Sequence, residues 1–453
     1  MTEQRTVVRD LVYERRRVTS WGHTRYGEGQ VFTARTADHV AEIFGSLKGS
    51  TIVARGLGRS YGDCCINDGA AMVDMVSHDR VLEIDGRQGR VVCEAGVSLR
   101  QLASIAHHHG WRLPVYPGTG FVTVGGAIAN DIHGKEQHVA GTFGHHVLWI
   151  DLLTPDGLIR RVSTADDAEL FAATVGGVGL TGIILRAAIQ LAAVESHAIR
   201  VEERRCSDIE SIASALESGA SRYPSMVAWL DLMSEGPGRG ILEFAEPVDS
   251  PVSDVRLRGT IDLPFRFPEF AINGISMRVF NALVYHRIAS GGRVRVLHRN
   301  QLVFPLDALG EWHRAYGKRG LFQFQCCVPT VGAVSTFMQM RDELVRAGIG
   351  STLAVMKWVG KRGAGTLSFT RPGLSLAMDF PGGSATVALI HRLQQLVVRA
   401  QGTVYLAKDA CLRPEEYRTM YEEAGEFARL LERVDPQRLM QSDMSRRLTM
   451  HEG

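Results

Sequence analysis

Three glycine-rich runs lie within the first 191 residues of this 453-residue chain, and each adjoins sequence with the apolar pattern of β-strands. The runs are ARGLGRSYGD (54–63), PGTGFVTVGGAIAND (117–131) and TVGGVGLTGII (174–184). Glycine lacks a Cβ and adopts positive φ freely, so such loops can bring backbone N–H groups close to an anion. Independent turns rarely gather in this way. The pattern therefore favours one extended ligand that contacts all three loops.

The first run differs from the dinucleotide-binding fingerprint. Gly56, Gly58 and Gly62 follow the apolar letters STIV with the spacing GxGxxxG. The fingerprint GxGxxG needs a helix that begins at once, because the N-terminus of that helix meets the pyrophosphate. The turn residues Asn67 and Asp68 follow instead, and no helix is predicted. The run indicates either a phosphate-binding loop or a glycine-rich turn without a ligand.

Strand and helix patterns alternate in the first half of the chain. Residues 31–47 predict a strand and then a helix capped near Thr36 or Asp38. A later segment predicts two strands around a turn, followed by a helix that begins at Ser98 and ends at Gly110. The sequence therefore predicts mixed α and β structure.

Composition excludes several classes of protein. With 51 Lys and Arg against 49 Asp and Glu, the net charge is +2, which disfavours polyanion binding. The N-terminus is charged and lacks an apolar signal region, and no window reaches the roughly 18 apolar residues of a membrane span. The seven cysteines form no CxxC pair, so neither a metal site nor a disulfide framework is expected.

In this order and spacing, the glycine runs resemble the flavin-binding domain of the vanillyl-alcohol oxidase superfamily, also called the p-cresol methylhydroxylase fold. The resemblance implies an α+β fold, with a two-subdomain FAD-binding domain and a substrate domain with an antiparallel sheet and flanking helices. It implies an FAD-binding domain over 1–193, a substrate domain over 194–402 and a C-terminal return to the first domain over 403–453.

Further motifs resemble the decaprenylphosphoryl-ribose oxidase branch of that superfamily, from about residue 21 to the C-terminus. They include LFQFQCCVP (321–329), VMKWVG (355–360), LAMDFP (376–381) and VYLAKDA (404–410). The resemblance implies FAD-dependent oxidation of the 2′-hydroxyl of a polyprenylphosphoryl-β-D-ribose to the 2′-keto sugar. This is the first half of an epimerisation to the arabinose donor of cell-wall arabinan, which an NADH-dependent short-chain reductase partner completes.

Two other functions stay open on the same fold. One is an oxygen-using oxidase of free sugars, polyols or aldonolactones, and the other is a flavin-binding protein without turnover. In many superfamily members a histidine of the first loop bonds covalently to the flavin. Arg59 stands at the matching position and cannot form that bond. Dissociable, non-covalent FAD is therefore expected.

The resemblance also implies the set of FAD-binding residues, which come from the three loops and from one tyrosine near the C-terminus. They are Ala54, Arg55, Gly56, Leu57, Gly58, Arg59, Ser60, Tyr61, Gly62, Gly118, Thr119, Thr123, Val124, Gly125, Gly126, Asn130, Ile132, His133, Gly179, Gly182, Ile183, Ile184 and Tyr405.

Three residues are candidates for catalysis: Lys408, His133 and Tyr61. Alcohol oxidation needs removal of a hydroxyl proton, and a cation beside the flavin stabilises the charge that the ring gains. The resemblance places a lysine at position 408 in reach of both substrate and ring. Desolvation would lower its pKa and let it act as a base, although an orienting cation remains the alternative.

The predicted substrate-binding residues are Lys135, Gln323, Gln325, Lys357, Ser375, Ala377 and Lys408. Gln323 and Gln325 alternate with phenylalanines, which puts both amides on one face of a strand. Lys135 is suited to a phosphate. Ala377 stands where the family carries an inhibitor-reactive cysteine, and Ser375 replaces a larger amide residue, so the pocket wall is altered.

Residues 265–300 hold six arginines against one acid, interleaved with phenylalanines. Such a stretch can rest on anionic lipid and admit a polyprenyl tail, which predicts a peripheral membrane contact. A mobile hinge, or an amphipathic helix packed on its own domain, is the equal alternative. The expected location is therefore the cytoplasm or the membrane periphery, with the membrane face left open.

Overall fold

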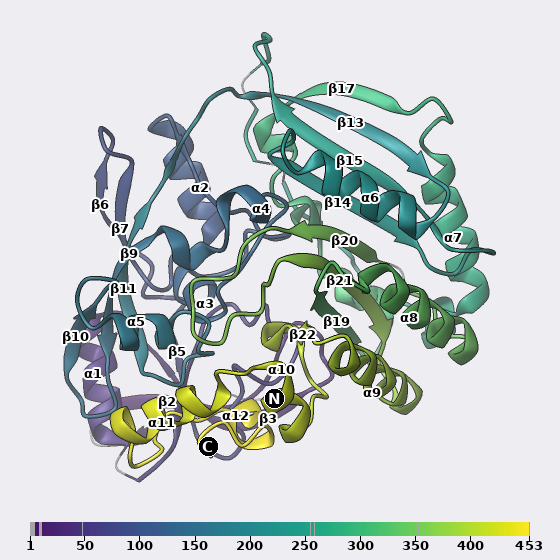
Figure 1. Ribbon diagram of the computed structural model, residues 1–453. Helices are drawn as coiled ribbons and strands as arrows, with labels where there is room; N and C mark the ends of the chain where they lie inside the picture. The colour runs from purple at the N-terminus through teal and green to yellow at the C-terminus, as the bar shows by residue number, and fades with distance from the viewer. Residues whose placement is uncertain are drawn as a thin grey trace.

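The computed structural model describes residues 5–8, 11–47, 49–253, 255–257, 259–351 and 353–452. Helices surround three main β-sheets, two with five strands and one with eight. In Figure 1 the eight-stranded sheet lies beside the region that holds the two smaller sheets. The predicted α+β class is confirmed.

The first sheet comes from the N-terminal segment and has the order β1-β2-β3-β5-β4. Its strands are β1 (Arg5–Val8), β2 (Leu11–Thr19), β3 (Tyr26–Thr33), β4 (Ile52–Arg55) and β5 (Ala71–Asp74). Strands β3, β5 and β4 run parallel, and α1 (Ala37–Ser46) connects β3 to β4. The Thr36 hydroxyl oxygen accepts a hydrogen bond from the His39 N–H at 3.1 Å, which is one of the two predicted helix caps.

The second sheet is antiparallel, with the order β10-β9-β11-β7-β6. Its strands are β6 (Val81–Asp85), β7 (Arg90–Glu94), β9 (Val147–Leu153), β10 (Ile159–Val162) and β11 (Ile183–Gln190). The helices of this region are α2 (Leu99–His108), α3 (Val124–Ala129), α4 (Gln137–Ala140) and α5 (Ala168–Thr174). Helix α2 is capped by Ser98 and is followed by Gly110 at φ 75°, as predicted.

The third sheet is antiparallel and has the order β17-β13-β15-β14-β20-β21-β19-β22. Its strands are β13 (Ala198–Cys206), β14 (Ser225–Asp231), β15 (Arg239–Pro247), β17 (Arg293–His298), β19 (Leu321–Val328), β20 (Ala354–Val359), β21 (Gly373–Pro381) and β22 (Thr403–Val404). Helices α6 (Ile209–Gly219), α8 (Ala333–Ala347) and α9 (Ser384–Arg399) cover one face of it, and α7 (Gly274–His286) lies at the periphery (Figure 1).

The two faces of this sheet differ because side chains alternate along each strand. On β14, Met226, Ala228 and Leu230 are buried on the face that carries the helices. Val227 and Trp229 point to the other face and are only half-buried. The uncovered face is therefore free to line a cavity.

Two short pairs complete the sheets: β8 (Trp111–Arg112) with β12 (Ala192–Ala193), and β16 (Ile261–Asp262) with β18 (Leu309–Gly310). Within the described residues, no helix combines the length and the apolar character needed to span a bilayer.

The C-terminal segment joins the large sheet to the first one. Strand β22 pairs with β19, and the segment continues through α10 (Pro414–Met420), α11 (Ala424–Val434) and α12 (Asp443–Arg447). Between α11 and α12, Met440 forms a parallel bridge with Ile52 of β4. The Arg447 guanidinium binds Asp63 at 2.7 Å and Asp409 at 2.9 Å, which ties this segment to the first glycine run.

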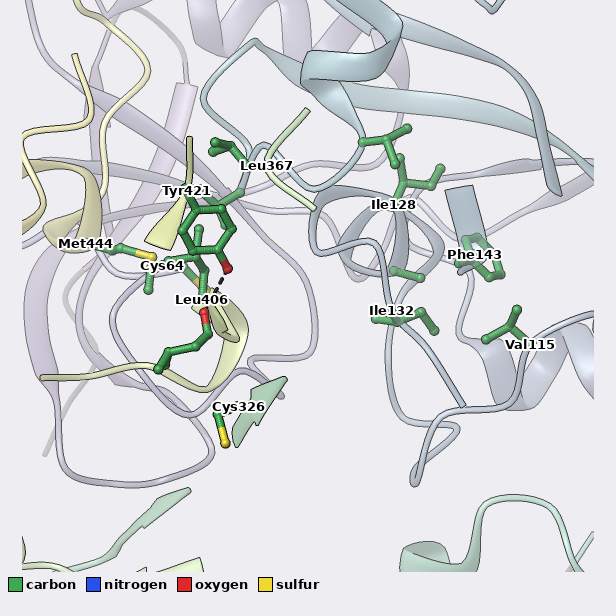
Figure 2. Packing of buried hydrophobic residues seen from close by; sticks show 14 of the residues in the cluster. Cys64, Val115, Ile128, Ile132, Phe143, Cys326, Leu367, Leu406, Tyr421 and Met444 are labelled. Atoms are coloured by element: carbon green, nitrogen blue, oxygen red, sulfur yellow. Dashed lines mark hydrogen bonds between the residues drawn. The ribbon is translucent and has the colours of Figure 1, made fainter. Parts of the chain in front are cut away.

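One apolar core connects segments that are far apart in sequence. Figure 2 shows Cys64, Ile128, Cys326, Leu406 and Tyr421 among the buried residues of this cluster. These residues come from the N-terminal, central and C-terminal parts of the chain. The boundaries at 193 and 402 therefore stay a prediction, since the packing is continuous across them.

Candidate active site

A cavity of about 350 Å³ lies where the three glycine runs meet the uncovered face of the eight-stranded sheet. Most of the predicted FAD-binding residues line it. They are Ala54, Arg55, Gly56, Leu57, Gly58, Arg59, Ser60, Tyr61, Gly118, Thr119, Thr123, Gly125, Gly126, Asn130, Ile132, His133, Gly179, Gly182, Ile184 and Tyr405. The runs that the sequence places up to 130 residues apart thus form one wall.

Three predicted FAD-binding residues lie behind this wall instead. A Cβ on Gly62 would meet the Asp409 carbonyl oxygen at 1.6 Å, so this glycine permits a close approach of two backbones. Val124 and Ile183 are fully buried in the apolar core. These three support the loops from behind and do not line the cavity.

The glycines of the first run act through their backbone. A Cβ on Gly56 would lie 2.3 Å from the Thr123 hydroxyl oxygen, and Gly58 has φ 63°. No helix follows the run before β5, as the sequence predicted. The wall of the cavity is therefore a loop of exposed amides, which suits phosphate oxygens.

Lys408 and Tyr61 meet at the floor of the cavity. The Lys408 ammonium lies over the Tyr61 ring, with its Nζ 4.0 Å from the ring centroid. The Tyr61 N–H donates to the Ala407 carbonyl at 2.9 Å, which holds the two segments in register. Burial lowers the pKa of Lys408, and Asp379 opposes that shift while Lys357 adds to it.

Asp379 is a residue that sequence reasoning quoted within LAMDFP but did not assign. It is 1% exposed, accepts a hydrogen bond from the Gln323 amide, and its Oδ2 has no partner among the described residues. Burial raises the pKa of this carboxyl. The signal was present in the sequence, because Asp379 lies two residues after Ala377 and hence on the same strand face.

His133 belongs to a buried hydrogen-bond network with Gln325 and Ser375. The Gln325 Nε2 donates to His133 Nε2 at 2.9 Å and to the Ser375 hydroxyl at 3.2 Å. Burial holds the pKa of His133 well below its usual value, with Lys357 and Lys408 adding to the effect. The neutral ring therefore carries its proton on Nδ1, a buried atom with no partner among the described residues.

The remaining predicted substrate residues divide between the cavity and its surroundings. Gln323, Gln325, Lys357, Ala377 and Lys408 line the cavity. Ser375 is fully buried behind Gln325.

Lys135 lies outside the first cavity. It lines an adjoining cavity instead, where its Nζ binds Glu243 at 2.6 Å. Burial lowers the pKa of the nearby Lys357 to about 8, and Lys135 contributes to that shift.

Arg59 lies against aromatic rings that the sequence did not assign to the site. Its guanidinium carbon is 4.0 Å from the ring centroid of Trp21 and 5.1 Å from that of Phe121. All three residues line the cavity. Their proximity depends on tertiary packing, and no local motif indicates it.

A segment from the substrate half covers the cavity. The β16-β18 pair and the loop after it contribute Asp262, Glu311 and Trp312 to the lining. Asp307 accepts hydrogen bonds from the Thr119 hydroxyl at 2.5 Å and from the Gly120 N–H at 3.1 Å. These contacts join residues almost 190 positions apart, and no local motif indicates them.

The lining fits FAD. It offers glycine backbone without side chains and three buried polar atoms that have no partner among the described residues: Asn130 Oδ1, His133 Nδ1 and Arg59 Nε. Gly179 has φ 82° and nothing within 4 Å of its Cβ position, so its side faces open space. Nucleotide phosphates and a flavin ring would satisfy these groups.

Comparison with known proteins supports the same cofactor. The family described as FAD binding domain matches residues 29–163. A decaprenylphosphoryl-β-D-ribose oxidase of Mycolicibacterium smegmatis is 36% identical over 451 residues, covering 96% of this chain and 98% of that protein. An uncharacterised protein of Streptomyces coelicolor is 30% identical, covering 78% of this chain and 100% of that protein.

More distant similarity is confined to part of the chain. The L-gulonolactone oxidase of Bos taurus is 30% identical over 176 residues, covering 38% of this chain and 39% of that enzyme. The M. smegmatis relative matches nearly the whole chain, whereas the L-gulonolactone oxidase matches little more than a third of it. The chain belongs to the decaprenylphosphoryl-β-D-ribose oxidase family and is an FAD-dependent oxidoreductase.

Proposed function

We propose that this chain oxidises the 2′-hydroxyl of a polyprenylphosphoryl-β-D-ribose to the 2′-keto sugar. One observation carries the proposal: a lysine with a lowered pKa, a neutral histidine and two glutamines all line the cavity that fits FAD. The similarity to the M. smegmatis relative over nearly the whole chain supports the substrate class.

Lys408 removes the hydroxyl proton in this proposal. A lysine accepts a proton only as the neutral amine, and burial lowers the pKa of Lys408 toward the range where that form is populated. The Tyr61 ring packs against the lysine side chain, with its centroid 4.0 Å from Nζ, and so helps to position the amine. Bound FAD supplies the hydride acceptor.

His133 and the glutamines orient the sugar. His133 Nδ1–H is a donor without a partner among the described residues, so it can bind a sugar oxygen. Gln325 fixes the His133 ring by donating a hydrogen bond to its Nε2. The Gln323 amide donates to the Asp379 carboxylate, which fixes the Gln323 side chain. A buried amide network of this kind positions a hydroxyl group more rigidly than solvent-exposed side chains do.

Lys357 and Lys135 bind the phosphate. Lys357 lines the cofactor cavity and the adjoining cavity at once. No carboxylate pairs with it among the described residues, and after burial the Lys135 ammonium contributes most to its lowered pKa. A phosphodiester beside Lys357 would supply the missing negative charge.

FAD is held without a covalent bond in this proposal, because the Arg59 guanidinium stacks on Trp21 and offers no nucleophile. Acid precipitation should release all the flavin to the supernatant. Flavin that stays in the washed pellet would contradict this assignment.

A reductase partner completes the epimerisation in this proposal. Oxidation leaves a 2′-keto sugar, and inversion of that carbon needs reduction from the opposite face. We expect the keto product to accumulate with this chain alone and to disappear when an NADH-dependent short-chain reductase is added. Accumulation that the reductase leaves unchanged would argue against the pairing.

Helix α7 is proposed as a contact with anionic membrane lipid. Ile275, Val279 and Leu283 are 76%, 57% and 69% exposed and lie one turn apart on one side of the helix. Phe270, just before the helix, is 78% exposed, and Arg278 adds positive charge. An apolar strip flanked by cations is the pattern of a helix that lies on an anionic membrane surface.

Vesicle flotation tests this contact. The wild-type chain should float with vesicles that contain anionic lipid and much less with zwitterionic ones. The double variant Val279→Glu, Leu283→Glu should lose most of this binding, whereas Val331→Glu, at another exposed apolar residue, should not. Equal flotation of both variants would remove α7 from the contact.

Anaerobic reduction of the bound flavin tests the proposed reaction itself. Polyprenylphosphoryl-β-D-ribose should bleach the flavin absorbance, and free ribose, polyols and aldonolactones should not. Rapid bleaching by free sugars, with peroxide formation in air, would favour an oxygen-using sugar oxidase. Bound FAD that no member of the panel reduces would favour a non-catalytic flavin protein.

A further inference from the structure

A second cavity of about 350 Å³ adjoins the cofactor cavity. The two share part of their lining, namely Pro117, Gly118, His133, Leu306, Val355 and Lys357. A ligand bound beside Lys357 can therefore extend from one cavity into the other. The proposed base Lys408 and the sugar-orienting Gln323 and Gln325 all line the first cavity, and none lines the second.

One cross-strand row connects the two cavities along the uncovered sheet face. Ile241 pairs with Trp229, Trp229 with Val355, Val355 with Ala377, and Ala377 with Gln325. Directly opposed residues of neighbouring strands point to the same face. The row therefore begins in the second cavity with two large apolar side chains and ends at the polar group that holds His133.

The rest of the second cavity is largely apolar as well. Ile199, Val227 and Ala245 add to the sheet side of the cavity. Tyr116 and Phe304 come from loops outside the sheet and contact each other with their ring centroids 5.3 Å apart. An apolar slot of this kind favours a hydrocarbon over a second sugar.

Four of the five glutamates that line this cavity form ion pairs, among them Glu136 with Arg112 at 3.6 Å. Glu243 binds Lys135 at 2.6 Å, Glu203 binds Arg293 at 2.6 Å, and Glu246 binds Arg200 at 2.8 Å. Lys357 and Arg299 are the lining cations without an acidic partner within 4 Å among the described residues, and of these two only Lys357 also lines the cofactor cavity. The charge pattern thus places an anion between the polar cavity and the apolar one.

We propose that the second cavity binds the isoprene units next to the phosphate, with Trp229 as their main contact. This assignment rests on the proposed function and adds to it the path of the lipid. The sugar lies at Gln325 and Lys408, the phosphate at Lys357, and the hydrocarbon on the Val355, Trp229 and Ile241 row. Arg287, the residue that follows α7, lines the same cavity and links it to the proposed membrane helix.

Two substrates that differ only in the group on the phosphate test the assignment: farnesylphosphoryl-β-D-ribose and methylphosphoryl-β-D-ribose. Under anaerobic conditions the holoenzyme should be half-saturated by the farnesyl compound at a concentration at least tenfold lower, since several buried CH₂ groups contribute about 0.8 kcal/mol each. Equal half-saturation would overturn the lipid subsite while leaving the reaction intact. Failure of both compounds to reduce the flavin would instead overturn the proposed function.

Variants locate the preference within the cavity. Trp229→Ala should bring the ratio of the two half-saturating concentrations, methyl compound to farnesyl compound, close to one. Trp229→Phe should keep most of the wild-type preference for the farnesyl compound. Val296→Ala, on the exposed edge strand β17 of the same sheet, is the matched control and should keep the wild-type ratio.

A direct binding measurement does not depend on turnover. Calorimetric titration of the holoenzyme with farnesyl phosphate should give a dissociation constant that Trp229→Ala raises by roughly tenfold or more. An unchanged constant in Trp229→Ala, or binding that farnesyl phosphate and methyl phosphate share equally, would place the hydrocarbon elsewhere.

Discussion

The two cavities are built in different ways. One side of the cofactor cavity is walled by loop backbone, in which Gly56, Gly58 and Gly179 leave amides exposed. The adjoining cavity is walled by side chains that stand on one face of an antiparallel sheet, such as Trp229 and Ile241. Added side chains strain the backbone wall, by a clash at Gly56 and by the positive φ at Gly58 and Gly179, whereas a side-chain wall can be reshaped residue by residue. The first should therefore hold one cofactor, and the second should set which substrate fits.

Lys408→Ala has the largest expected effect, because it removes the proposed base from the floor of the cofactor cavity. Flavin reduction by substrate should fall by a factor on the order of 10³, while FAD content stays at the wild-type level. Stopped-flow absorbance measures both. Lys318→Ala, at an exposed lysine, is the control, and near-normal reduction in Lys408→Ala would remove this residue from the reaction.

Gly56→Val tests the backbone wall directly. The new Cβ would lie 2.3 Å from the Thr123 hydroxyl oxygen, so the first loop must shift away from the helix that Thr123 caps. We expect the purified variant to retain less than about a tenth of the wild-type flavin, as judged by the ratio of flavin to protein absorbance. Gly45→Ala, whose Cβ meets nothing within 4 Å, should keep full occupancy. Full occupancy in Gly56→Val would mean that the loop is not tightly fixed.

Ala377→Val alters the sheet side of the cofactor cavity without touching the loops. Two added methyl groups on the row between Gln325 and Val355 narrow the path of the substrate. KM should rise by about tenfold with little change in FAD content, since one or two carbons in a pocket change binding by about 1–3 kcal/mol. Ala165→Val, in an exposed loop, serves as the control. A loss of flavin together with the rise in KM would show that the two walls are not independent.

Asp379→Asn should have the smallest effect at optimal pH and a clear effect on the pH profile. If Lys408 is the base, flavin reduction rises with pH through the pKa of this lysine, which burial lowers from 10.5. The Asp379 carboxylate raises that pKa, so its removal should move the rising limb toward lower pH. The rate of anaerobic flavin reduction across pH measures the limb. A limb that stays in place, or that moves to higher pH, would contradict the coupling.

The fold and the cofactor wall could largely be predicted from the sequence. Positions 58 and 179 have positive φ, which glycine adopts without strain. At position 56 the absence of a side chain leaves room for Thr123. Such backbone requirements can be recognised in the sequence, because they select glycine at particular positions. The same holds for Thr36 and Ser98, whose side chains cap their own helices and need no distant partner.

Part of the catalytic set could also be predicted, because strand alternation is a local property. Gln323 and Gln325 lie two residues apart and both line the cofactor cavity. The same rule applied to β21 would have found Asp379 beside Ala377. Alternation does not show which side chain a neighbour covers or which cavity a loop residue reaches. Ser375 is therefore buried behind Gln325, and Lys135 lines the adjoining cavity, although both were expected in the first one.

The amino-acid sequence alone determined the three backbone loops, the helix caps and the alternation of side chains along each strand, since each depends on the conformational freedom of a few neighbouring residues. Tertiary structure decided the rest. Register brought Trp229 next to Val355 and Ala377 next to Gln325, packing placed Asp307 against Thr119, and burial shifted the pKa values of Lys408 and His133. These depend on distant segments that exclude water together, and no short stretch of sequence contains both partners.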